Sequence, residues 1–242
     1  MSWQHFERLG ADYASARPPY PAVVFEVLRS EGVIGAGLRV LEVGAGAGLA
    51  TRDLVASGSE VVALEPGRDL ASLLAEAVTG VEILTSRLED ADLPRAAFDS
   101  VVAATSLHWV DLAVALPRLH ETLRPGRALA VFRTIFGDDG YRTEFRDRVQ
   151  RIVSERETAE PETQREGRPT MDELSAGGYF RPVRSERWRW SVELTTEHVT
   201  RLFRTFSNWT EDEVRAVQAA AEACGGIVTE HYQSVLHVLR RR

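Results

Sequence analysis

The chain has 242 residues, a formal net charge of −7 and a single cysteine, Cys224. This length suits one α/β domain, and one cysteine excludes an intrachain disulfide and a cysteine-cluster metal site, as expected in a reducing compartment. The negative net charge argues against a nucleic-acid partner. The chain contains arginine but no lysine, which excludes lysine-based catalysis. Because neither a signal peptide nor an apolar run of about 18 residues is recognisable, we expect a cytoplasmic protein without a membrane partner.

Strands alternate with helices over the first part of the chain. Apolar runs predict strands over 38–43, 60–64, 81–85, 98–104 and 128–133, and helices over 20–30, 49–57, 69–77 and 112–123. Such alternation predicts a parallel sheet covered by helices on both faces. Arg124, Pro125 and Gly126 predict a turn before the fifth strand.

The pattern changes beyond residue 134. The polar segment 138–176 predicts helices interrupted by loops, in an inserted cap and not a second domain. A strand over 184–194, helices over 196–206 and 211–224, and a final strand over 226–239 follow. Thr195 or Thr196, and Thr210, are the expected N-caps of the two helices. The last two strands need not run parallel to the others.

A glycine-rich loop follows the first predicted strand. The apolar run that contains Glu42 ends in Gly44, Ala45, Gly46, Ala47 and Gly48. Small residues let a ligand approach the backbone closely. The dinucleotide-binding spacing G-x-G-x-x-G needs a third small residue where Leu49 stands, or where Thr51 stands in the other register, so neither register fits. The alternative to a ligand-binding loop is a plain turn. Glu42 either contacts a ligand through water or only orients the loop.

The second predicted strand ends at Glu65 and Pro66. Glu65 lies 17 positions after Gly48, near the offset of about 20 residues at which nucleotide-binding α/β folds place a ribose-binding acid. A carboxylate there can accept hydrogen bonds from both ribose hydroxyls. Alternatively, Glu65 only caps the helix that begins near Gly67.

Four further motifs stand in order along the chain. They are Tyr13 to Pro21 (Y-A-S-A-R-P-P-Y-P), Arg87-Leu88-Glu89 before Leu93-Pro94, Ser106-Leu107-His108-Trp109, and Leu123-Arg124-Pro125-Gly126. Together with the glycine loop, they resemble class I S-adenosylmethionine (SAM)-dependent methyltransferases, and within these the trans-aconitate methyltransferase-like branch that acts on small molecules. Arg127 departs from the family pattern, which has a second glycine there.

This resemblance implies an α/β fold: a three-layer, Rossmann-like, seven-stranded and mostly parallel sheet with an antiparallel last strand and helices on both faces. It implies one domain over 1–242. Within it, 1–35 form an N-terminal lid and helix, 36–135 a SAM-binding core, 136–180 a variable cap, and 181–242 the C-terminal strands and helices.

The resemblance also implies roles for residues near the cofactor. The loop of Gly44, Ala45, Gly46 and Gly48 lies near the methionine portion of SAM, Glu65 and Pro66 near the ribose, and Leu88 and Glu89 beside the adenine. Thr105 and Ser106 lie near the sulfonium. Tyr13 and Arg17 close over the site, where the arginine can pair with the cofactor's carboxylate. The alternative for Arg17 is a surface position before a proline turn.

His108 is the candidate catalytic base, because among the histidines it alone follows a predicted ligand-facing strand end. Packing against Trp109 is its alternative role. Trp188, Trp190 and Trp209 could line an acceptor pocket or belong to the core, and Tyr20 is expected to pack. No metal-ligand spacing is found. We therefore expect transfer of a methyl group to a hydroxyl or carboxylate oxygen of a small molecule, by a monomer or homodimer.

Two other functions stay open at this stage. The chain could bind SAM without methylating, or use the fold for another reaction such as a cyclisation. Less in keeping with the glycine spacing, it could be a nicotinamide-dependent oxidoreductase.

Overall fold

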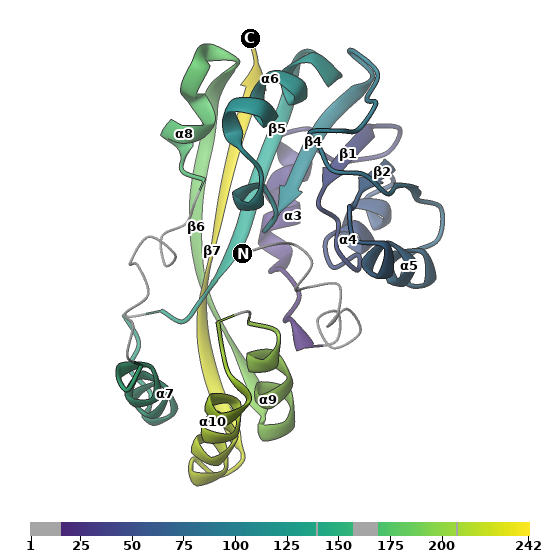
Figure 1. Ribbon diagram of the computed structural model, residues 1–242. Helices are drawn as coiled ribbons and strands as arrows, with labels where there is room; N and C mark the ends of the chain where they lie inside the picture. The colour runs from purple at the N-terminus through teal and green to yellow at the C-terminus, as the bar shows by residue number, and fades with distance from the viewer. Residues whose placement is uncertain (1–15, 139, 157–168, 207) are drawn as a thin grey trace.

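One seven-stranded sheet organises the protein (Figure 1). The computed structural model describes residues 16–138, 140–156, 169–206 and 208–242. The strand order is β3-β2-β1-β4-β5-β7-β6, with bounds β1 Arg39–Val43, β2 Glu60–Leu64, β3 Glu82–Leu84, β4 Phe98–Ala104, β5 Leu123–Phe136, β6 Phe180–Thr195 and β7 Ile227–Arg241. The strands β1 to β5 pair in parallel, whereas β7 is antiparallel to both β5 and β6. The predicted fold class is confirmed.

Helices cover both faces of this sheet. They are α3 Ala22–Ser30, α4 Thr51–Ala56, α5 Arg68–Ala77, α6 Leu112–Thr122, α7 Glu144–Ser154, α8 Met171–Ser175, α9 Thr196–Arg204 and α10 Glu211–Ala223, with short 3-10 turns at Leu107–Trp109 and Ala176–Gly178. Leu41, Val101 and Leu129 pack with α6 on one face. The alternate residues Val40 and Val102 pack with α3 and α4 on the other. Alternation of side chains along each strand thus builds two cores.

The predicted N-caps of two helices agree with the structure, whereas the predicted Pro-Gly turn differs from it. Thr195 accepts a hydrogen bond from the amide of His198, and Thr210 forms a capping box with Glu213, which confirms both predicted N-caps. The predicted turn at 124–126 lies inside β5 instead of before it. Strand pairing jumps there from Leu123 to Ala128, so these residues form an irregularity at the edge shared with β4.

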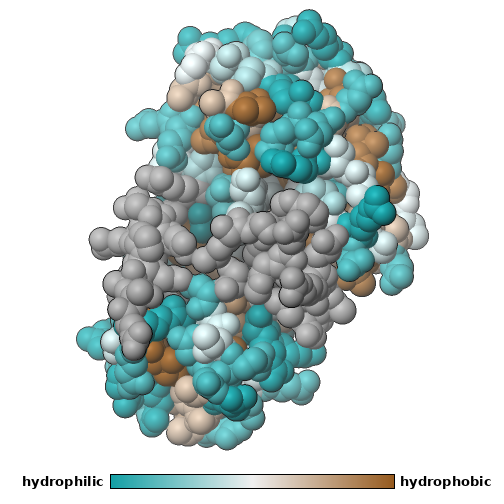
Figure 2. Space-filling model, viewed as in Figure 1, coloured by the Kyte–Doolittle hydropathy of each residue, from teal (hydrophilic) through white to brown (hydrophobic). Residues whose placement is uncertain are grey.

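The strands β5, β6 and β7 extend beyond the rest of the sheet and carry a cap (Figure 1). Helix α7 follows β5, whereas α9 and α10 connect β6 to β7. The three helices share one apolar cluster that includes Phe145, Leu202 and Val217. Their surface in Figure 2 is mostly hydrophilic, as expected when the apolar faces turn toward that cluster. The cap is therefore built from two separate chain segments. No helix in the described part of the chain is long and apolar enough to cross a membrane.

Candidate cofactor and acceptor site

A cavity of about 150 Å³ opens at the carboxyl ends of β1, β2 and β4. In open α/β sheets this edge is where ligands bind. The cavity brings together most of the residues predicted to bind the cofactor: Gly44, Gly46, Glu65, Pro66, Leu88, Glu89, Thr105 and Ser106. Ser86, Arg87, Trp109 and Val110 also line it. Ala45, Gly48 and Glu42 are not among the lining residues.

The three glycines of the loop have different reasons to be glycine. All have positive φ, at 69° for Gly44, 57° for Gly46 and 90° for Gly48. A Cβ on Gly44 would lie 2.5 Å from the Cβ of Ser106, and one on Gly48 would lie 2.7 Å from Leu74 Cδ1. Apart from its chain neighbours, a Cβ on Gly46 would meet no atom of the described residues within 4 Å. Gly44 and Gly48 therefore permit close packing, whereas Gly46 borders the open cavity.

Glu65 holds the glycine loop and the next helix at once. Its Oε2 accepts a hydrogen bond from the amide of Gly46 at 2.8 Å, and its Oε1 accepts one from the amide of Gly67 at 2.9 Å. Gly67 is the N-cap residue of α5, so the helix-capping alternative describes one of these contacts. Each carboxylate oxygen can accept a second hydrogen bond, which leaves capacity for ribose hydroxyls.

Glu42 lies behind the loop and outside the cavity. Its carboxyl is buried, with Oε2 accepting from the Thr51 hydroxyl at 2.6 Å and Oε1 without a partner in the described structure. Burial raises the pKa of Glu42 to about 8; the hydrogen bond from Thr51 opposes this rise, and the negative charge of Glu65 adds to it. Glu42 is thus mostly protonated at neutral pH and supports the loop from beneath.

The pKa of Glu42 predicts a pH-dependent stability. Between pH 4.5 and about 8 the folded chain holds a proton that the unfolded chain has released, so Glu42 stabilises the fold at low pH and loses this effect as the pH rises. We expect Glu42→Gln to melt close to wild type at pH 5 and clearly above it at pH 8. Thermal unfolding at both values checks this; an equal difference at the two pH values would contradict it.

Thr105 directly follows β4 and has a strained backbone conformation. It is one of the non-glycine residues with positive φ, at 54°, and such strain clusters at functional sites. Its amide donates to the carbonyl of Phe132 at 2.7 Å, and its hydroxyl forms a 2.8 Å hydrogen bond with the hydroxyl of Tyr20. Tyr20 also packs edge-on against Phe132, with ring centroids 4.9 Å apart. Tyr20 packs as predicted, but its hydrogen bond to the cavity wall was missed.

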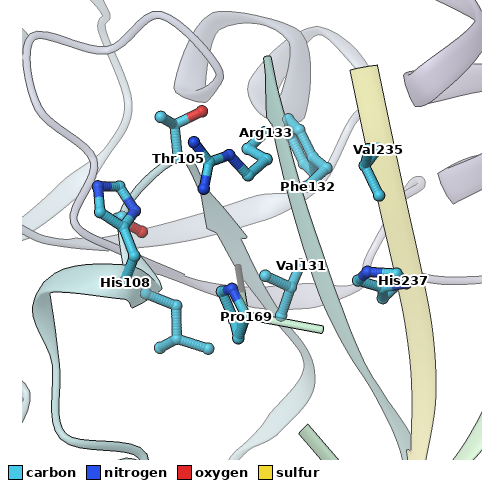
Figure 3. A pocket seen from close by; sticks show the side chains of 10 residues that line it. Thr105, His108, Val131, Phe132, Arg133, Pro169, Val235 and His237 are labelled. Carbon is cyan, nitrogen blue, oxygen red and sulfur yellow. The ribbon is translucent and has the colours of Figure 1, made fainter. Parts of the chain in front are cut away.

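His108 lies beside the cavity and not in it. It lines a small adjoining pocket, of about 10 Å³, that shares Thr105 and Ser106 with the cofactor cavity (Figure 3). Its ring contacts Trp109, with centroids 4.8 Å apart. Partial desolvation by the surrounding protein atoms and the nearby charge of Arg133 lower the pKa of His108 to about 4, although its side chain is exposed to solvent. The imidazole is therefore neutral at physiological pH and is a weaker base than a free imidazole.

The structure places Arg17 outside the cavity. Its guanidinium lies between the rings of Phe136 and Phe206, at 4.6 and 4.5 Å, and donates to the carbonyl of Thr205 at 3.4 Å. Arg17 thus contacts the cap, and its predicted pairing with the cofactor's carboxylate stays a prediction. Tyr13 lies outside the described residues.

The tryptophans take packing positions. Trp209 packs against Phe203 in the cap, with ring centroids 4.6 Å apart. The indole of Trp190 donates to the hydroxyl of Ser234 at 3.0 Å and contacts Tyr232, and Trp188 packs against the core of the sheet. Of the three, Trp209 also borders the large groove between the cap and the sheet.

The sheet order and the strand-end cavity define a Rossmann-like protein with a ligand site at the glycine loop. The sequence pattern of a family described as a methyltransferase domain matches residues 41–131. Uncharacterized methyltransferase Rv3342 of Mycobacterium tuberculosis is 30% identical over 197 residues, which cover 81% of this chain and 74% of that protein. Mb3374 of Mycobacterium bovis has the same similarity.

Solved structures share the fold at lower identity. The [4+2]-cyclase SpnF has a TM-score of 0.60 at 14% identity, covering 98% of this chain and 94% of its own. Geranyl diphosphate C-methyltransferase from Streptomyces coelicolor, solved with S-adenosylhomocysteine (SAH), has a TM-score of 0.51 at 15% identity, covering 91% of this chain and 79% of its own. The chain belongs to the class I SAM-dependent methyltransferase family, whose cofactor is SAM.

Proposed function

We propose that this protein transfers the methyl group of SAM to an oxygen atom of a small-molecule acceptor. The observation that carries the proposal is the cavity in which the glycine loop, the Glu65 carboxylate and the ends of β1, β2 and β4 meet. Glu65 would accept hydrogen bonds from the ribose, Leu88 and Glu89 would flank the adenine, and Gly46 would face the methionine portion. As part of this proposal we retain an N-terminal lid over 1–35 and a SAM-binding core over 36–135, whereas the cap consists of α7 from the predicted cap segment together with α9 and α10 from the predicted C-terminal segment.

The residues around the cavity suit a displacement reaction. Bound SAM supplies an electrophilic methyl group on a positively charged sulfur. Thr105 and Ser106 line both the cofactor cavity and the pocket of His108, so they would lie between cofactor and acceptor. The rigid strand ends would align the two, which can supply several kcal/mol. Neutral His108 would take the proton from a hydroxyl acceptor, whereas a carboxylate acceptor needs no base.

A second function is supported by the fold itself. SpnF, whose name is that of a [4+2]-cyclase, shares this fold, so the fold alone does not fix the reaction. A protein that binds SAM without methylating would bind SAM and SAH yet release no SAH with any acceptor. Incubation with SAM and an acceptor library, followed by quantification of SAH, separates the two functions.

Glu65 provides the sharpest test of the cofactor site. We expect Glu65→Ala to weaken SAM and SAH binding about 10- to 100-fold, because it removes a charged acceptor for two hydroxyls. Isothermal titration calorimetry with SAM, SAH and NAD measures this on wild type and variant. Glu82→Ala, an exposed acid on β3, is the matched control and should bind like wild type. Unchanged SAH affinity in a folded Glu65→Ala variant would remove the ribose assignment.

A further inference from the structure

A groove of about 1290 Å³ lies between the cap and the extended strands β5, β6 and β7. Part of its lining comes from one continuous face of the three strands, and Val131 continues this face into the pocket of His108. Strand pairing aligns this face in rows: Val131, His237 and Ser185; Arg133, Val235 and Arg187; Ile135, Gln233 and Arg189. We name these residues the floor patch. It carries three arginines and no acidic residue, in a chain whose net charge is −7.

The acidic residues that border the groove are already paired with arginines. Asp138 pairs with Arg189 at 2.8 Å. The others pair likewise, in Asp147–Arg142, Glu186–Arg184 and Glu230–Arg146. Arg187 differs, because its guanidinium donates to the neutral amide oxygen of Gln233, at 2.7 Å. Within the described part of the chain, Arg187 therefore keeps a positive charge that no carboxylate offsets.

The floor patch continues to the pocket of His108. Val131, Arg133, Val235 and His237 line that pocket together with Thr105 and Ser106. Figure 3 shows the guanidinium of Arg133 extending toward Thr105 and His108. Arg187 lies two strands away from Arg133, across Val235, which corresponds to about 10 Å between their backbones. A molecule lying on the patch would thus reach from Arg187 to the wall of the cofactor cavity.

We propose that the floor patch is the acceptor subsite, and that it holds an oxyanion of the acceptor, a carboxylate or a phosphate, away from the methylated atom. The inference rests on the proposed function, since it assigns a substrate class to the same site. Arginine matches carboxylate and phosphate oxygens with a planar fork of donors. Gln233 holds Arg187 in place, and Val235 and Ile135 supply apolar contact for the body of the acceptor.

The test uses small anionic probes on the SAH-loaded protein. Saturation-transfer NMR measures binding of benzoate, phenyl phosphate and the uncharged isostere benzamide at millimolar concentrations. We expect at least one anionic probe to bind and benzamide to bind much more weakly. Binding of benzoate alone would indicate that the acceptor carries a carboxylate. Binding of phenyl phosphate alone would indicate that it carries a phosphate. Arg187→Gln should weaken the anionic probe at least about fivefold, because it removes the charge and the fork.

Arg181→Gln is the matched control, since Arg181 is an exposed arginine of the same strand outside the groove lining. It should bind the probes like wild type. Arg187 is exposed too, so both variants are expected to melt like wild type. Three results would overturn the subsite. They are equal probe affinity for wild type and Arg187→Gln, equal binding of benzoate and benzamide, and the absence of any probe binding. SAH affinity, measured on the same samples, shows separately whether the cofactor site survives.

Discussion

Replacing Gly46 with valine is expected to abolish measurable binding of SAM and SAH, a loss of more than about 100-fold, while the fold persists. Apart from its chain neighbours, a Cβ at this position meets no atom of the described residues within 4 Å, and Gly46 lines the cavity, so a valine side chain would project into the space that we assign to the cofactor. The positive φ of 57° adds strain, because β-branched residues disfavour it. Calorimetry with SAH measures the loss, and circular dichroism checks the fold.

The chain offers a matched control for this variant. Gly126 also has a positive φ, at 72°, and open space around its position, but it lies at the opposite end of the sheet. Gly126→Val therefore introduces comparable strain without touching the cavity, and it should bind SAH like wild type. If Gly46→Val bound SAH as tightly as Gly126→Val, the glycine loop would be only a turn.

His108→Ala is expected to reduce the methyl-transfer rate about 10²- to 10⁴-fold for a hydroxyl acceptor, with SAH affinity unchanged. The ring lies outside the cofactor cavity and is neutral at pH 7, so it can act on the acceptor without holding SAM. For a carboxylate acceptor no base is needed, and the variant should mainly raise KM. Single-turnover kinetics with the acceptor found by library screening separate the two cases.

His120→Ala controls for the loss of an imidazole elsewhere. His120 lies in α6, where its Nε2 contacts the carbonyl of Arg242 at 3.2 Å, and it lines neither the cofactor cavity nor the pocket of His108. We expect its kinetics to match wild type. If the His108→Ala variant had the rate and KM of wild type, His108 would have no catalytic role and would only pack against Trp109.

Short segments of the sequence were sufficient to predict which residues meet at the strand-end cavity. Gly44, Gly46 and Glu65 follow directly from apolar strand runs, and parallel strands bring their carboxyl ends to one edge. The seven-stranded, mostly parallel sheet with an antiparallel last strand was predicted from the family resemblance and not from the strand patterns themselves, whereas the order of the strands was not predicted. Local sequence also predicted the threonine caps, because capping depends on residues only three positions apart.

Contacts between distant segments could not be predicted in this way. Tyr20 and Thr105 are separated by 85 positions, and no local pattern marks their hydrogen bond. The floor patch depends on the register of three strands, because a shift by one residue would turn Arg187 to the other face. Arg17 was predicted to face the cofactor because its charge suits a carboxylate, but its place between Phe136 and Phe206 depends on how the cap packs.

The central claim is that the strand-end cavity holds SAM, and a crystal structure of the protein with SAH tests it most directly. We expect the ribose hydroxyls within hydrogen-bond distance of the Glu65 carboxylate, the adenine beside Leu88 and Glu89, and the amino-acid portion against Gly46. The sulfur should lie beside Thr105 and Ser106. SAH bound elsewhere, or a cavity that stays empty at saturating SAH, would contradict the account.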